Sequence, residues 1–163
     1  MQAAFVREFF RLCQEAGIHT ALDTSGAIAT DEAFAVLDYT DLVLLDIKTA
    51  DDELHPSYTG LNRQNNQRWL DHLLSIGKPT WIRHVVVPNR TADDEHLLAV
   101  ARLIKSYLPI VERVELLPYH TMGRQKYQEL GIDYPLDGIP DLSQAEIDHA
   151  RQVMRSVLPI VVQ

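Results

Sequence analysis

Residues able to do chemistry stand in, or just after, four short apolar runs of this 163-residue sequence. Each run is rich in Val, Ile or Leu, and the polar residues are Asp23, Asp46 with Lys48, Arg83, and His120. Runs of this length, separated by helix-length segments, are typical of buried parallel strands. Because the chemistry of α/β folds gathers at the carboxyl ends of such strands, we expect the five side chains to form an active-site rim.

Lys48 and Asp46 suggest one reaction by themselves. A lysine amine can form a Schiff base with a carbonyl substrate, and the neighbouring carboxylate would then shuttle protons. On this hypothesis the chain is a complete small lyase. Trapping of Lys48 by borohydride with small aldehydes or keto acids would test it.

The elements that must position these residues alternate between helices and strands. Helical periodicity predicts helices over residues 3–16, 31–38, 63–76 and 92–107, and one after Ser143. Strands are predicted over residues 18–24, 42–48, 80–87 and 112–118, with residues 160–162 as a candidate short strand. Capping boxes are expected at Thr91–Asp94 and Ser143–Glu146. The loop over residues 119–141 is long enough for a lid or a binding loop.

Two architectures fit this α/β order, a doubly wound sheet and an arc of a β/α barrel. Asp46 and Lys48 share one face of their strand with Leu42 and Leu44, and Arg83 lies in the middle of the next strand. A sheet covered by helices on both faces would bury these charges, at a cost of several kcal/mol unless they are paired. A barrel interior that opens to a ligand accommodates them, so we favour the arc, with parallel strands and helices on the outer face.

An arc of four strands leaves two unpaired edges, which proteins usually cover. Closed β/α barrels usually need about 200 residues or more. The first helix would also naturally follow a strand that is not in the sequence. We therefore expect residues 1–163 to be a single domain, and a truncated barrel.

The first helix is expected to turn one apolar side inward, formed by Phe5, Val6, Phe9, Leu12, Cys13 and Ala16. Cys13 is the one cysteine, and we expect it to be a core thiol. A single cysteine excludes an internal disulfide and any metal site built from several thiolates of this chain. Among the histidines, His84 faces away from Arg83 and should pack among helices. The others should be surface or hydrogen-bonded residues: His19, His55, His72, His96 and His149.

Composition excludes several classes of function. A net charge of −8 without a basic stripe argues against a nucleic-acid partner. No apolar run approaches the roughly 18 residues of a membrane span. The N-terminus lacks the pattern of a secretory signal, so we expect a cytoplasmic protein.

Five segments carry a resemblance to a known family: Phe5–Phe10, His19–Gly26, Thr40–Lys48, Trp81–Pro88 and Glu115–His120. Together they resemble, in order and with similar spacing, the glycyl-radical-activating family of radical S-adenosylmethionine enzymes, which includes the activating enzymes of pyruvate formate-lyase. The resemblance implies a partial (β/α)6 barrel, of which this chain supplies the last four βα units. It also implies a 4Fe-4S cluster that reduces S-adenosylmethionine, giving a 5′-deoxyadenosyl radical. That radical takes a hydrogen atom from a glycine of pyruvate formate-lyase or a related glycyl-radical enzyme. Flavodoxin or ferredoxin would be the electron donor.

The resemblance also implies a monovalent cation beside the cofactor's carboxylate. Asp23, Thr24 and Asp46 would hold it, with help from the carbonyl of Leu44. Such oxygen ligands suit a hard cation. The alternative is structural: Asp23 caps the following turn and Asp46 pairs with Lys48.

By the same resemblance, Asp46, Lys48 and His120 bind S-adenosylmethionine, Lys48 at its carboxylate and His120 at its ribose. Arg83 would help to place the glycine-bearing peptide. The alternatives are a simple Asp46–Lys48 ion pair, an unspecialised loop histidine, and a structural ion pair made by Arg83.

The sequence departs from the family in one large respect. The family's Cys-x3-Cys-x2-Cys loop and Gly-Gly-Glu motif would both precede Met1, in two βα units that this chain lacks. Because a cluster needs several thiolates, Cys13 alone cannot hold one, and the chain by itself is expected to be inactive. A further alternative is therefore a non-catalytic module that binds a glycyl-radical enzyme or completes its barrel with another polypeptide.

Overall fold

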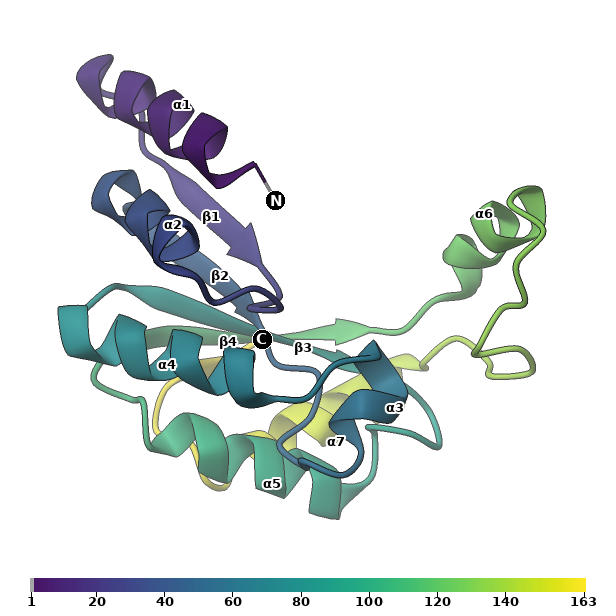
Figure 1. Cartoon of the computed structure of the whole chain (residues 1–163). Coiled ribbons are helices and arrows are strands. Elements are labelled where there is room, and N and C mark those ends of the chain that lie inside the picture. The colour runs from purple at the N-terminus through teal and green to yellow at the C-terminus, as the bar shows by residue number, and fades with distance from the viewer. Residues whose placement is uncertain (1) are drawn as a thin grey trace.

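A computed structural model describes residues 2–163 as a single five-stranded sheet with surrounding helices (Figure 1). The strands are β1 (Ala21–Thr24), β2 (Leu42–Asp46), β3 (Thr80–Val86), β4 (Val111–Pro118) and β5 (Val161–Val162). The α-helices are α1 (Ala3–Glu15), α2 (Asp31–Phe34), α3 (His55–Thr59), α4 (Gln64–Ile76), α5 (Asp94–Lys105), α6 (Arg124–Glu129) and α7 (Gln144–Arg155). Two 3-10 helices complete the fold, η1 (Ala35–Tyr39) and η2 (Thr121–Gly123).

The strand order decides between the two expected architectures. All neighbouring strands are parallel, and they follow the chain order β1-β2-β3-β4-β5. Right-handed crossovers that never reverse direction place every connecting helix on the same face, whereas a doubly wound sheet reverses its order at a switch point. Figure 1 accordingly shows α1, α2, α4, α5 and α7 around the outside of a curved sheet. The α/β fold is thus the expected arc.

Burial alternates along the two central strands as an arc requires. In β2, Val43 and Leu45 are fully buried beneath the helices, whereas Leu44 and Asp46 on the other face are half-buried. In β3, Ile82 and His84 are buried, and Arg83 is half-buried. The inner face of the arc is therefore open enough to hold charged side chains.

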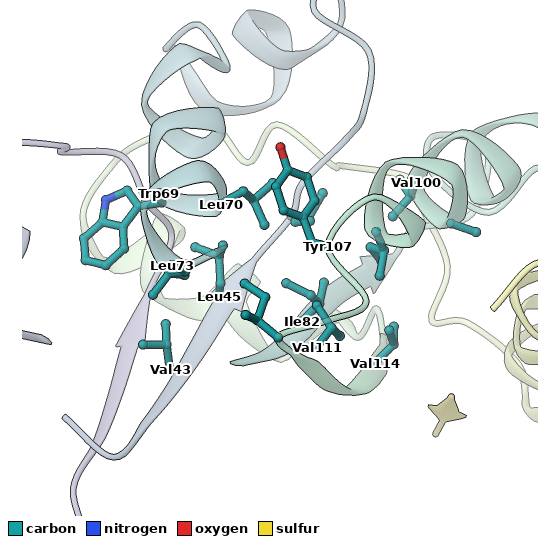
Figure 2. Close-up of a cluster of buried hydrophobic side chains, with 14 of the residues drawn as sticks. Val43, Leu45, Trp69, Leu70, Leu73, Ile82, Val100, Tyr107, Val111 and Val114 are labelled. Carbon is teal, nitrogen blue, oxygen red and sulfur yellow. The ribbon is translucent and has the colours of Figure 1, made fainter. Parts of the chain in front are cut away.

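The core lies between the outer face of the sheet and the helices, as Figure 2 shows around β2, β3 and β4. Trp69 of α4 is completely buried, and its indole N–H donates to the carbonyl of Ile28 over 2.8 Å. Burying a polar N–H without such a partner would cost free energy, so the bond fixes how α4 sits on the sheet. The other labelled core residues are Val43, Leu45, Leu70, Leu73, Ile82, Val100, Tyr107, Val111 and Val114.

Helix caps explain where several helices begin. Thr30 accepts from the backbone N–H of Ala33 and opens α2, and Ser143 forms the expected capping box with Glu146 at the start of α7. The capping box expected at Thr91 is wrong. Asp93 caps α5 instead, because the Thr91 hydroxyl is used in a tight turn, where it accepts from the N–H of Val87 and donates to the carbonyl of Val85.

Substituting Ser143→Ala is expected to lower the free energy of unfolding by about 1 kcal/mol, because the N–H of Glu146 loses its acceptor. Urea unfolding at neutral pH measures the change. The matched control is Ser75→Ala near the end of α4, where the hydroxyl only back-bonds to the carbonyl of His72. That change should be close to neutral, because alanine is the better helix former. Equal losses in the two variants would contradict the role given to the cap.

Two expectations at the N-terminus are wrong. The inward side of α1 is formed by Ala3, Val6 and Phe10, whereas Phe5, Phe9 and Leu12 are at least half exposed. Cys13 is only half-buried, so it is not a core thiol. Apolar residues occupy two sides of this helix, and the sequence pattern does not say which side meets the sheet.

The first strand begins later than expected, at Ala21 rather than residue 18. Thr20 does not extend it because its N–H and hydroxyl both donate to the carboxylate of Asp41. Two short helices were also not predicted. They are α3, between β2 and α4, and α6, in the long loop between β4 and α7, where it stands off from the body (Figure 1). Among residues 2–163, no helix has the length and apolar character needed to cross a bilayer.

Candidate binding site at the carboxyl ends of the strands

Strand register brings three of the predicted residues together. Asp46 at the end of β2 lies directly opposite Arg83 of β3, and Asp23 of β1 lies opposite Leu44, two residues before Asp46. Registered partners on neighbouring strands share a face of the sheet, as do residues two apart in one strand, so all three point to the inner side of the arc. The expected meeting of these side chains is confirmed.

The three residues and Lys48 form one continuous ion-pair network. The guanidinium of Arg83 donates from Nε to Oδ1 of Asp46 over 2.9 Å and from Nη1 to Oδ2 of Asp23 over 2.8 Å. Its Nη2 bonds the remaining oxygen of Asp23. Lys48 Nζ donates to Oδ2 of Asp46 over 2.8 Å. Two carboxylates are thus matched by two cations, and each of their four oxygens has a charged partner.

Partial burial should make this network contribute more to the free energy of unfolding than a surface ion pair does. The side chains of Asp46 and Arg83 are only 17% and 18% exposed. Burial alone would lower the pKa of Arg83, but hydrogen bonds and charge from Asp23 and Asp46 outweigh it, so the pKa is raised. The guanidinium therefore remains charged at any physiological pH. Breaking a pair that is this far removed from water costs more than breaking an exposed one.

Thr24, rather than Asp23, makes the turn after β1. Its hydroxyl oxygen accepts from the N–H of Gly26 over 3.1 Å. Asp23 is free of that task and instead holds Arg83 in a two-pronged contact. The structural alternative in which Asp23 caps the turn is therefore wrong, whereas the Asp46–Lys48 pair and the Arg83 ion pairs are present.

His120 is not brought into this network. It follows the end of β4 as an exposed residue at the start of η2. Among the residues that the structure describes, it makes no hydrogen bond or ion pair with Asp23, Asp46, Lys48 or Arg83.

Lys48 lies between two cavities that the sequence did not predict. One, of about 230 Å³, is bounded by the turn after β1 and by α3, including Gly26, His55 and Tyr58. The other, of about 350 Å³, lies between β3 and the α6 segment and includes Val85 and Tyr127. The ammonium of Lys48 is thus paired with Asp46 and still reachable by a ligand in either cavity. His55 and Tyr58 come from the short helix α3, which has no periodic pattern to identify it, whereas Tyr127 lies in the long loop that was expected to be a lid or a binding loop.

A buried histidine pair lies on the outer face behind this site. His84 is 1% exposed, as expected for a residue packed among helices, and its Nδ1 bonds the carbonyl of Ile47 over 2.7 Å. The ring of His96 stacks on it, with centroids 5.5 Å apart. Burial lowers the pKa of His84 to about 4 and also lowers that of His96. The expectation of a surface or hydrogen-bonded His96 is wrong, because its Nε2 is buried without a partner among the described residues.

Comparison with known proteins adds independent information. The profile of the Radical SAM superfamily matches residues 1–101. The pyruvate formate-lyase-activating enzyme of Clostridium pasteurianum is 39% identical over 158 residues, which are 97% of this chain and 66% of that protein. The pyruvate formate-lyase 1-activating enzyme of Escherichia coli K12 is 34% identical, over 94% of this chain and 63% of that protein. The chain therefore spans a little under two thirds of the length of these relatives.

Solved structures support the fold. A crystal structure of a domain of pyruvate-formate lyase-activating enzyme from Bacteroides vulgatus ATCC 8482 superposes with a TM-score of 0.79 at 20% identity. The match covers 99% of this chain and 91% of that domain. Streptococcus suis SuiB gives a TM-score of 0.69 at 12% identity, over 96% of this chain and 35% of SuiB. Since the superfamily profile covers well over half of the sequence, this chain belongs to the radical SAM superfamily.

Proposed function

We propose that this chain is the carboxyl-terminal part of a radical S-adenosylmethionine enzyme that activates pyruvate formate-lyase or a related glycyl-radical enzyme. The observation that carries the proposal is the 39% identity, over almost the entire chain, to a protein named for that activity. The charged network at the strand ends supports it, because it lies where the chemistry of α/β barrels is found.

The proposal gives each site residue a task. In such enzymes S-adenosylmethionine and an iron–sulfur cluster supply the radical that removes a hydrogen atom from the target glycine. Lys48 fits the cofactor's carboxylate, because its ammonium is reachable from two cavities and a charge-assisted hydrogen bond is strong there. Asp46 orients Lys48, His120 contacts the ribose, and Arg83 helps to place the glycine-bearing peptide.

The cluster needs a contribution from outside these 163 residues, which contain one cysteine. We propose that the relatives' additional third of length corresponds to the missing βα units and the three-cysteine loop. Strand β1 has no second neighbour among the described residues, and Phe5, Phe9 and Leu12 are exposed on α1, the helix that precedes it. Such an edge and apolar face suit further barrel units. Flavodoxin or ferredoxin as electron donor and a cytoplasmic location belong to the same proposal.

The experiment has two steps. In-frame DNA upstream of the Met1 codon should encode a Cys-x3-Cys-x2-Cys loop and a Gly-Gly-Glu motif. The full-length protein, reconstituted anaerobically with iron and sulfide, should then cleave S-adenosylmethionine and install a radical on pyruvate formate-lyase. Absence of the motifs, together with no cleavage by the longest product of the gene, would refute the proposal.

The monovalent cation fits less well. Aspartate oxygens are suitable ligands for a hard cation, but Arg83 and Lys48 already bond all four oxygens of Asp23 and Asp46. With Arg83 in this position, the residues do not accommodate the ion. A cation site made of Asp23, Thr24, Asp46 and the Leu44 carbonyl therefore requires Arg83 to turn away, and no step of the reaction is assigned to it.

Substituting Arg83→Gln tests this competition. The variant should be less stable than the wild type in choline chloride, because two neighbouring carboxylates lose their shared partner. Potassium or sodium at about five times its Kd should return about 1 kcal/mol in the variant. The wild type should respond equally to choline, sodium and potassium. Thermal unfolding in matched salts measures this, and an identical salt response in both proteins would rule the cation site out.

A further inference from the structure

Helix α4 holds the turn that follows β1 through three side chains. The amide of Asn65 donates to the carbonyl of Ala27 over 2.7 Å, and the Trp69 indole donates to that of Ile28. Asn66 donates to the carbonyl of Ser25 over 3.2 Å. Three backbone acceptors of a turn without regular structure are therefore satisfied by one helix, which fixes the turn in place.

Asn66 differs from the other two because it also reaches the next strand. The same Nδ2 donates to the carbonyl of Asp46 over 3.0 Å. Its side chain is buried, with only 4% of the residue exposed, and its Oδ1 has no partner among the described residues. The two N–H groups of a single amide thus bridge the carboxyl end of β2 and the turn after β1. Rotating the amide by half a turn would set Oδ1 against two carbonyls, so one orientation is strongly favoured.

The backbone of the turn lies close against this bridge. Gly26 has φ +67°, and a Cβ added there would lie 3.1 Å from Nδ2 of Asn66 and 3.2 Å from Cδ1 of Trp69. A glycine is therefore required both by the left-handed backbone and by the close approach. The amide of Asn66 also tethers this turn to α4 through the carbonyl of Ser25.

We infer that Asn66 is a positioning residue for the charged site. It sets the spacing between the ends of β1 and β2 at which one guanidinium, that of Arg83, contacts Asp23 and Asp46 together. The effect of Asn66 on S-adenosylmethionine binding rests on the proposed function. The effect of Asn66 on the Arg83 contacts does not.

The direct readout is hydrogen exchange of the Arg83 Nε–H, which is bonded to Asp46. Asn66→Ala should speed this exchange about tenfold relative to the wild type, because the two carboxylates no longer keep their spacing. Asn65→Ala is the matched control. It removes a bond from the same helix to the same turn but leaves β2 untouched, so the exchange should stay within about twofold. A tenfold change in an exchange equilibrium corresponds to about 1.4 kcal/mol. If Asn66→Ala does not fold, Asn66→Ser carries the same comparison.

Urea unfolding of the same variants separates positioning from plain stability. Asn65→Ala and Asn66→Ala should shift the urea midpoint by similar amounts, while only Asn66→Ala exposes Arg83 to exchange. Unchanged protection of Arg83 in Asn66→Ala, or equal loss in both variants, would overturn the inference. Equilibrium dialysis with S-adenosylmethionine adds the functional arm, in which Asn66→Ala should bind about tenfold more weakly than Asn65→Ala. If the wild-type chain does not bind the cofactor, the cofactor-binding roles proposed for Asp46 and Lys48 fail in this chain, and the exchange result still decides the role of Asn66.

Discussion

Substituting Asp46→Ala should lower the free energy of unfolding by about 2–3 kcal/mol and should abolish binding of S-adenosylmethionine. Among residues 2–163, Asp46 alone forms ion pairs with both Arg83 and Lys48. Without it, Arg83 keeps only the exposed carboxylate of Asp23, and Lys48, whose side chain is 35% exposed, has no ion-pair partner among the described residues. Removing one partner of a buried pair typically costs 3–5 kcal/mol. The estimate is reduced because Asp46 keeps some contact with water. Urea unfolding at pH 7.5 measures the change.

The control for this effect is Asp38→Ala. Asp38 also pairs with an arginine, Arg7, at 2.9 Å, but both side chains are more than 40% exposed. An exposed pair contributes about 0–1 kcal/mol, so the variant should remain close to the wild type. If Asp46→Ala and Asp38→Ala lower the free energy of unfolding equally, burial does not strengthen the ion pairs of Asp46, and the stabilising role given to them is refuted.

The second large effect is a loss of stability in mild acid that is caused by His84. Its pKa is lowered to about 4 by burial, against an ordinary value of 6.5. The unfolded chain therefore binds a proton at a higher pH than the folded chain does, so stability rises with pH. The free energy of unfolding that depends on neutral His84 is fully present above pH 6.5, and it is lost as the pH falls toward 4. Two and a half pKa units correspond to about 3 kcal/mol, of which about 2 kcal/mol should disappear between pH 7 and pH 5.

His84→Asn isolates this contribution. The asparagine amide can still donate to the carbonyl of Ile47, but it does not titrate. The groups around the ring are His96, whose pKa is also lowered, Lys48, and the carboxylates of Asp51 and Asp93 beside His96. Urea unfolding from pH 8 to pH 5 should therefore give a distinctly flatter profile for the variant, with some slope left from His96. Parallel profiles for the two proteins would show that His84 does not drive the acid sensitivity.

Much of the fold could be predicted because the strands follow simple physical rules. Val43 and Leu45 alternate with Leu44 and Asp46, and that period of two identified both the buried face and the open face. The cost of burying Asp46 and Arg83 against helices then selected the barrel arc. Ser143 marked the start of the last helix because a side-chain cap is a local interaction, readable within four residues.

The errors arose where tertiary contacts decide the outcome. Phe5 and Phe9 lie on one side of α1 and Phe10 on another, and only packing on the sheet determines which side is buried. Thr91 has the right spacing for a cap, but a turn uses its hydroxyl. Asn66 was missed because an asparagine within a helix carries no local signal, and its partners lie 20 and 41 residues away.

We propose that S-adenosylmethionine binds at the carboxyl ends of β1, β2 and β3, with its carboxylate at Lys48. The most direct measurement is a titration of the isotopically labelled 163-residue chain with S-adenosylmethionine, followed by two-dimensional NMR. We expect saturable shifts that centre on the amides of Thr24, Lys48 and Arg83 and are lost in Lys48→Ala. Shifts confined to the outer helices α5 and α7, or none at millimolar cofactor, would contradict it.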